Sequence, residues 1–182
     1  MHVDVGETSS VEELFSNIRA MFPQPVSIVV NSAGIAALSP IVDCTDELFD
    51  EIIRVNLKGA FAVTRAACRE MVRSGQELPE GGGAIVNVSS TSVKHCSFGS
   101  CAYSSSKAGV EALTKSAAKE MATYGIRCNT VLVGLTETPM TAGLSEERRA
   151  FLTSQTPQKR AAQPQEIAEA ILFLCAPSAS SF

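Results

Sequence analysis

Residues 90–107 read STSVKHCSFGSCAYSSSK, and this stretch decides how the rest of the chain is interpreted. The apolar run Ala84–Val88 just before it predicts a buried strand that ends at Ser90. From about Ala102 onward the residues are typical of a helix, so Tyr103 and Lys107, four positions apart, share one helix face. The stretch therefore predicts a strand, a loop and a helix that carry three polar groups close together.

These three groups suit proton transfer to a carbonyl oxygen. We expect the positive charge of Lys107 to lower the pKa of Tyr103 from about 10 towards neutrality. The Ser90 hydroxyl can hydrogen-bond the same substrate oxygen. Together the groups can protonate that oxygen while a hydride reaches its carbon. A Tyr-x-x-x-Lys pattern also occurs in ordinary helices, so the interpretation depends on the motifs around it.

Three more segments accompany the stretch. Asn31-Ser32-Ala33-Gly34 follows the apolar run 28–30, Asn56 lies within a predicted helix, and residues 133–138, VGLTET, follow a strand predicted at 126–133. Each has an ordinary explanation by itself: a strand-to-loop turn for residues 31–34, and a satisfied core amide or a surface turn residue for Asn56. Their combination and order point to a common chemistry.

The whole set, over essentially all 182 residues, resembles the short-chain dehydrogenase/reductase family. Within this family it most resembles the 3-oxoacyl-[acyl-carrier-protein] reductases and the estradiol 17-beta-dehydrogenase type 8 group, partly through residues 124–129, YGIRCN. A nucleotide-sugar epimerase of the extended branch shares Tyr-x-x-x-Lys, but the short lid expected over residues 139–163 argues against it. The resemblance implies reversible, NAD(P)-dependent reduction of a carbonyl in a 3-oxoacyl thioester, a ketosteroid or a similar small molecule.

The resemblance also implies roles for individual residues. Asn56 would bind a water that links Lys107 to bulk solvent, Lys107 would hold the ribose hydroxyls, and Thr138 would contact the nicotinamide amide or the adjoining phosphate. The catalytic residues implied are Asn56, Ser90, Tyr103 and Lys107. The cofactor-binding residues implied, for NAD or NADP, are Asp4, Val5, Asn31, Ala33, Gly34, Tyr103, Lys107, Gly134, Thr136 and Thr138.

The expected fold is α/β, a partial Rossmann-like doubly wound parallel sheet in a single domain over residues 1–182. Strands are predicted at 27–30, 84–88 and 126–133. Helices are predicted up to residue 21 after a cap at Ser9 or Ser10, over 46–73 as one helix or two with Thr45 or Asp46 as the cap, and over 102–123, 145–154 and 164–175. Against the family pattern, we expect the sheet to lack the N-terminal βαβ cofactor half and the last strand. An apolar strand edge should then be exposed, and the chain alone should bind dinucleotide weakly and fold poorly. The alternative function is an inactive, truncated form that serves as a scaffold or oligomerisation subunit.

Composition excludes several other classes of protein. Hydrophobic residues make up 45% and charged residues 19%, as in globular proteins, and a net charge of −4 argues against nucleic-acid binding. No apolar run approaches the roughly 18 residues that span a bilayer. The six cysteines form no Cys-x-x-Cys pair, and with only His2 and His95 present we expect no metal site.

The N-terminus is neither a signal nor a transit sequence, so we expect a cytoplasmic protein, with the mitochondrial matrix as the alternative. The family further implies a homo- or hetero-oligomer, a dimer or tetramer.

Overall fold

Three parallel strands form the sheet of this protein. The computed structural model describes residues 1–73 and 77–182. Its strands are β1 (Ile28–Asn31), β2 (Gly83–Ser90) and β3 (Ile126–Val133), hydrogen-bonded in the order β1-β2-β3. Asn31 lies opposite Asn87, and Ser90 lies opposite Val133. The predicted α/β class with a parallel sheet is confirmed, and β2 and β3 end side by side.

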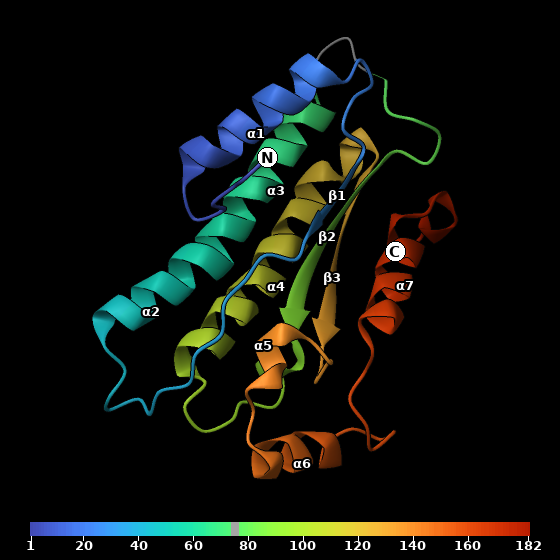
Figure 1. Cartoon of the computed structure of the whole chain (residues 1–182). Coiled ribbons are helices and arrows are strands. Elements are labelled where there is room, and N and C mark those ends of the chain that lie inside the picture. Colours follow the sequence, from blue (N-terminus) through green and yellow to red (C-terminus); the bar gives the residue numbers. More distant parts are fainter. Residues whose placement is uncertain (74–76) are drawn as a thin grey trace.

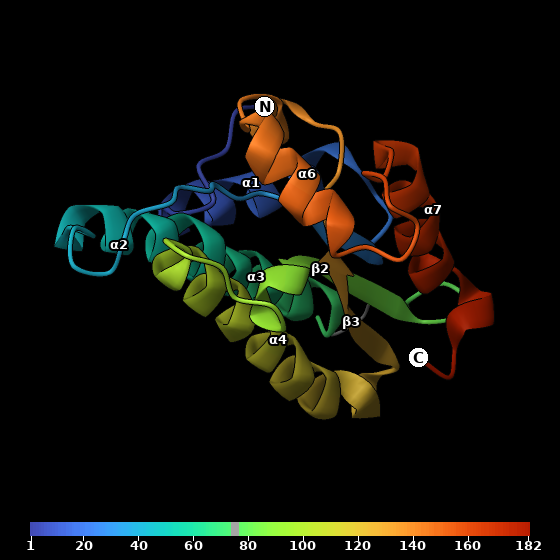
Figure 2. The ribbon, with the colours of Figure 1, turned by 90° about the horizontal axis from the view of Figure 1, so that it is seen from below.

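Helices lie on both sides of this sheet. In Figure 1, α3 and α4 pack on one face with α1 beside α3, while α7 lies on the opposite side. Two short helices, α5 and α6, lie by the carboxyl ends of the strands in Figure 1. Figure 2, seen from below, again has β2 and β3 between α4 and α7. The bounds are α1 Thr8–Met21, α3 Gly59–Met71, α4 Cys101–Met121, α5 Pro139–Ala142, α6 Glu146–Ser154 and α7 Pro164–Cys175.

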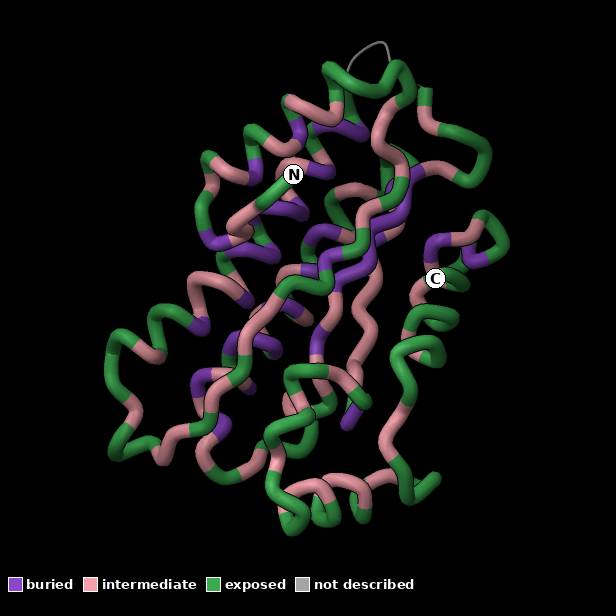
Figure 3. Tube along the Cα trace, viewed as in Figure 1, coloured by how far each residue is buried: buried purple, intermediate pink, exposed green. Residues whose placement is uncertain are grey.

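The core lies between the sheet and the helices α3 and α4, which cover one of its faces. Ala84, Ile85 and Val86 of the central strand are almost fully buried, because a strand inside a parallel sheet is covered on both faces. Phe15 of α1 and Met71 of α3 pack into the same cluster. Figure 3 shows the buried positions gathered along β2 and the inward helix faces, whereas α6 and α7 are largely exposed.

The helical stretch predicted over 46–73 is interrupted by a wider turn. It begins as α2 (Asp46–Ile52), continues as a π-helical segment, η1 (Ile53–Lys58), and resumes as α3. Thr45 is the cap of α2, as predicted, because its Oγ1 accepts a hydrogen bond of 3.2 Å from Leu48 N. Asn56 lies in the π-helical turn, a feature that is often found at functional sites.

The predicted cap of α1 is wrong. The helix begins at Thr8 after Glu7, and the Ser10 hydroxyl instead accepts a hydrogen bond of 3.1 Å from Asp4 N. The helix predicted over 102–123 is α4 followed by one 3₁₀ turn, η3 (Ala122–Tyr124), and it ends at Gly125 with a φ of 68°. Two further 3₁₀ turns, η2 and η4, span Thr91–Val93 and Pro177–Ala179.

The predicted strands at 27–30 and 84–88 are found at 28–31 and 83–90, and the helix predicted at 145–154 is α6, which has Ser145 as its cap. The short helix α5 was not predicted. Within residues 1–73 and 77–182, no helix is both long enough and apolar enough to cross a bilayer.

Candidate active site

Ser90, Tyr103 and Lys107 line one cavity. The cavity has a volume of about 470 Å³ and lies beside the carboxyl ends of β2 and β3. Ser90 is the last residue of β2, and Tyr103 and Lys107 lie in the first two turns of α4. The strand-loop-helix order of residues 84–107 thus brings the three groups to the same space, because the helix returns alongside the strand that precedes it.

Lys107 is a buried cation held by the backbone of β2. The residue is only 5% exposed, and its Nζ donates a hydrogen bond of 3.0 Å to the Val88 carbonyl. The Ser89 hydroxyl donates a hydrogen bond of 2.9 Å to the Lys107 carbonyl and so fixes α4 against β2. Burial lowers the pKa of Lys107 to about 8, because the charged form loses its hydration.

Tyr103 has a raised pKa. Burial raises the pKa of its phenol, and a hydrogen bond with the Ser90 side chain lowers it by less. The expectation that Lys107 lowers this pKa is wrong for the present arrangement, because burial disfavours the phenolate and the ammonium binds the Val88 carbonyl. Lys107 Nζ lies 6.0 Å from the centroid of the Tyr103 ring. The phenol is therefore protonated at neutral pH and can act as an acid.

Asn56 lies near Lys107, beside the loop that follows β1. Its Oδ1 accepts a hydrogen bond of 2.8 Å from Ile35 N, and its Nδ2 donates to the Ile35 carbonyl at 2.9 Å and to Ser106 Oγ at 3.0 Å. A Cβ added at Gly34 would lie 3.1 Å from Asn56 Oδ1 and 3.3 Å from Lys107 Nζ. The asparagine is a satisfied core amide that ties the loop after β1 to α4, and its role in holding a water stays a prediction.

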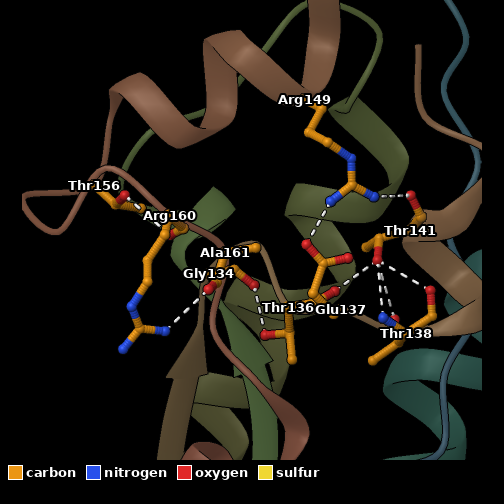
Figure 4. Close-up of polar contacts among 9 residues, drawn as sticks. All are labelled: Gly134, Thr136, Glu137, Thr138, Thr141, Arg149, Thr156, Arg160 and Ala161. Carbon is orange, nitrogen blue, oxygen red and sulfur yellow. Dashed lines mark hydrogen bonds and ion pairs between the residues drawn. The ribbon is translucent and has the colours of Figure 1, made fainter. Parts of the chain in front are cut away.

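Besides Tyr103 and Lys107, four more of the residues implied for cofactor binding line the same cavity: Gly34, Gly134, Thr136 and Thr138. Figure 4 shows how the loop between β3 and α5 is held. Thr136 Oγ1 donates a hydrogen bond of 3.2 Å to the Gly134 carbonyl, and Thr138 N donates one of 3.2 Å to Thr141 Oγ1. Arg149 of α6 pairs with Glu137 at 2.6 Å. These contacts fix the part of the cavity wall that this loop forms.

The other implied cofactor residues lie elsewhere. Val5, Asn31 and Ala33 line a separate groove of about 650 Å³ that runs along β1 and α1. The carboxylate of Asp4, at the start of α1, accepts hydrogen bonds of 2.9 Å from Gly6 N and 3.1 Å from Arg54 Nη1. The structure therefore divides the implied cofactor residues between two places.

A larger cavity adjoins the first. Its volume is about 1040 Å³, and it also reaches Ser90 and Tyr103, which lie where the two cavities meet. The loop after β2 contributes Cys96 and Phe98 to this cavity, and α6 contributes Arg148. The arrangement provides one space beside Lys107 and another, beneath the lid, that opens onto the same two hydroxyl groups.

Sequence reasoning missed several residues of the site. Ser89 and Ser106 position Lys107 and Asn56, respectively, and the Val88 carbonyl binds the lysine. The two serines lie next to residues that had been singled out, and small polar residues within buried elements are the available signal. Arg148 was not singled out, because nothing in the sequence distinguishes it from the neighbouring charged residues of its helix.

Comparisons with known proteins find similar reductases and dehydrogenases. A family model described as Enoyl-(Acyl carrier protein) reductase matches residues 1–182. The (3R)-3-hydroxyacyl-CoA dehydrogenase of Rattus norvegicus is 40% identical over 171 residues, which are 94% of this chain and 64% of that protein. The 3-oxoacyl-[acyl-carrier-protein] reductase FabG of Thermotoga maritima is 36% identical over 178 residues, 98% of this chain and 70% of that protein.

A solved structure described as that of a gluconate dehydrogenase from Agrobacterium tumefaciens superposes with a TM-score of 0.89 at 31% identity. The superposition covers 98% of this chain and 68% of the other. The chain thus spans 64% of the length of the hydroxyacyl-CoA dehydrogenase and somewhat more of the other two proteins.

Proposed function

Because this chain belongs to the short-chain dehydrogenase/reductase family, we propose that its site reduces the ketone of a 3-oxoacyl compound to a 3-hydroxyacyl alcohol and catalyses the reverse oxidation. The observation that carries the proposal is that Ser90 and Tyr103 lie together at the junction of two cavities. A ketone in the larger cavity can present its oxygen to both hydroxyl groups. The names of the relatives support 3-oxoacyl compounds over steroids as substrates.

In this proposal Tyr103 is the proton donor. Its raised pKa keeps the phenol protonated near neutral pH, so the proton is available when negative charge develops on the ketone oxygen. The Ser90 hydroxyl donates a hydrogen bond to the same oxygen and stabilises that charge. The buried amide of Asn56 keeps Ile35 and Ser106 in place beside Lys107, and resupply of the proton through a water held there is part of the proposal.

The cavity beside Lys107 fits the nicotinamide end of a dinucleotide. Gly34 has no side chain to crowd the lysine, since a Cβ there would lie 3.3 Å from Lys107 Nζ. Among the described residues the ammonium donates one hydrogen bond, to Val88, and has two further donors. Lys107, Gly134, Thr136 and Thr138 would hold the nicotinamide and its ribose, with NAD and NADP as alternatives. The dinucleotide supplies the hydride when it is bound.

A turnover assay tests the proposal. The chain is incubated with acetoacetyl-coenzyme A and reduced NAD or NADP, and the 3-hydroxyacyl product is quantified. We expect Ser90→Ala to lower kcat by about 100-fold or more, since it removes a donor aimed at the developing charge. Ser116→Ala, at an exposed position of α4, serves as the control and should leave kcat unchanged. A folded wild-type chain that forms no product under any of these conditions would contradict the proposal.

A second candidate function is that of a non-catalytic subunit in a homo- or hetero-oligomer. The apolar groove along β1 favours it, because Ile28 and Val30 are 54% and 44% exposed there. A surface of this kind associates with another apolar element. Size-exclusion chromatography beside the turnover assay separates the candidates: a stable assembly without product formation would favour the subunit.

A further inference from the structure

Arg148 lies in the wall of the larger cavity, on the lid helix α6. Its Nη2 donates a hydrogen bond of 2.6 Å to Ser97 Oγ, in the loop between β2 and α4. The guanidinium also lies 5.6 Å from the centroid of the Phe151 ring. Arg148 is thus half-buried between the lid and the loop that leads to Tyr103.

The charge of Arg148 is not balanced by a carboxylate among the described residues. The other two arginines around the lid are paired: Arg149 with Glu137 at 2.6 Å and Arg160 with Glu166 at 2.6 Å. Within residues 1–73 and 77–182, no acidic oxygen lies within 4.0 Å of a nitrogen of Arg148. Glu166, the one carboxylate lining this cavity, is already held by Arg160.

The donors of Arg148 are also largely unused. Nε is buried and has no hydrogen-bond partner, and Nη1 donates to none of the described residues. A guanidinium carries five N–H donors, and leaving a buried one unpaired destabilises the protein. The hydrogen bond to Ser97 does not by itself explain a cation at this position, because a neutral side chain could also donate a hydrogen bond to a hydroxyl group.

We propose that Arg148 binds an oxyanion, a carboxylate or a phosphate, carried by the substrate whose ketone lies at Ser90 and Tyr103. This inference rests on the proposed function, and it narrows the substrate class to acidic carbonyl compounds or thioesters of a phosphate-bearing carrier. Arg148, Ser90 and Tyr103 all line one cavity of about 1040 Å³, so the anion and the ketone of one substrate would share that cavity. A guanidinium suits this task because its planar donors match the oxygens of both anions.

Equilibrium binding by calorimetry, without dinucleotide, tests the inference. Three probes carry the same ketone: acetoacetyl-coenzyme A has phosphates, acetoacetate has a carboxylate, and the acetoacetyl thioester of N-acetylcysteamine is neutral. We expect at least one charged probe to bind the wild-type chain more tightly than the neutral probe. Arg148→Gln should weaken that binding by about 10- to 100-fold, the range for hydrogen bonds to a charged group, and leave the neutral probe unchanged.

Two more variants complete the experiment. Arg148→Lys keeps the charge but loses the planar donors, so its loss of affinity should lie between those of the wild type and Arg148→Gln. Lys119→Gln removes the same charge from an exposed position of α4 and should bind every probe as the wild type does. The charged probe that responds identifies the carboxylate or the phosphate as the anion.

The inference is overturned if the wild type binds charged and neutral probes equally, or if Arg148→Gln retains the preference. Should Arg148→Gln fail to fold, the wild-type comparison and Arg148→Lys still decide. Binding does not require turnover, so a chain that binds anionic probes through Arg148 without forming product would contradict the proposed function and not this inference.

Discussion

At the scale of single residues, burial sets the charge states of the site. Lys107 has a pKa of about 8 instead of 10.5, because little water reaches its ammonium. The same burial raises the pKa of Tyr103. A cation that is easily deprotonated therefore lies beside a phenol that holds its proton.

This pKa makes the stability of the chain depend on pH. Below pH 8 Lys107 is protonated in the folded and in the unfolded state, and burying its charge destabilises the folded state. Between about 8 and 10.5 the unfolded state binds the extra proton, so the free energy of unfolding should rise with pH by about 3 kcal/mol. Denaturant titrations across this range should show the rise in the wild type and not in Lys107→Met. If the free energy of unfolding rose equally with pH in the two proteins, Lys107 would not be the cause of the rise.

The sequence predicted that Ser90, Tyr103 and Lys107 lie together, but not the charge states of the last two. Ser90, Tyr103 and Lys107 could be found because the strand-loop-helix order fixes where they lie. The pKa of Tyr103 could not be predicted, because it depends on how far the phenol is buried. It also depends on the hydrogen bond between Lys107 and the Val88 carbonyl, which forms only when α4 packs on β2. Arg148 could not be distinguished either, since its use depends on the distant Ser97.

At the scale of elements, Arg127 joins β3 to the end of α7. Its Nη1 donates a hydrogen bond of 2.7 Å to the Leu174 carbonyl, and its Nη2 donates one of 3.1 Å to the Ala176 carbonyl. The carbonyls at the end of a helix lack partners within the helix and attract positive charge. Arg127 therefore anchors α7, whose Ile167 and Ile171 close the cavity beside Lys107.

Replacing this arginine should loosen α7. We expect Arg127→Met to lower the free energy of unfolding by about 2–3 kcal/mol, because it removes two hydrogen bonds from a charged donor while keeping much of the apolar stem. Hydrogen exchange should increase in α7 before it increases in β2. Arg69→Met, on α3, is the comparison, and a similar loss in both variants would contradict the anchoring role.

The strands were easier to predict than the helix boundaries. Continuous apolar runs mark strands buried in a parallel sheet, so β1, β2 and β3 were found within one or two residues. The cap of α1 was missed because the Ser10 hydroxyl is used by Asp4 N, a contact across a turn that periodicity does not show. The π-helical turn at 53–58 was missed for a similar reason, since it places Asn56 against Ile35 and Ser106.

At the scale of the whole molecule, the sheet has an exposed apolar edge. Among residues 1–73 and 77–182, β1 pairs only with β2, and its outer side borders the groove of about 650 Å³. Ile28 and Val30 are 54% and 44% exposed on it. An edge of this kind pairs readily with other chains, and a charged side chain on it prevents such pairing.

A lysine on this edge should reduce self-association. We expect Val30→Lys to keep the chain monomeric to higher concentrations, with a change of less than about 1 kcal/mol in the free energy of unfolding. Leu172→Lys adds the same charge at a 69% exposed position of α7 and should have little effect. Sedimentation velocity over a concentration series measures both, and equal effects would show that charge alone, and not the edge, controls association.

The central claim is that Tyr103 donates a proton to a ketone oxygen that Ser90 also holds, and Tyr103→Phe tests it most directly because the change removes one oxygen atom from the cavity wall. Reduction of acetoacetyl-coenzyme A, followed by loss of reduced-nicotinamide absorbance, should slow by about 100- to 10,000-fold, while the affinity for the dinucleotide stays within about twofold. Retention of wild-type turnover by a folded Tyr103→Phe chain would contradict the account.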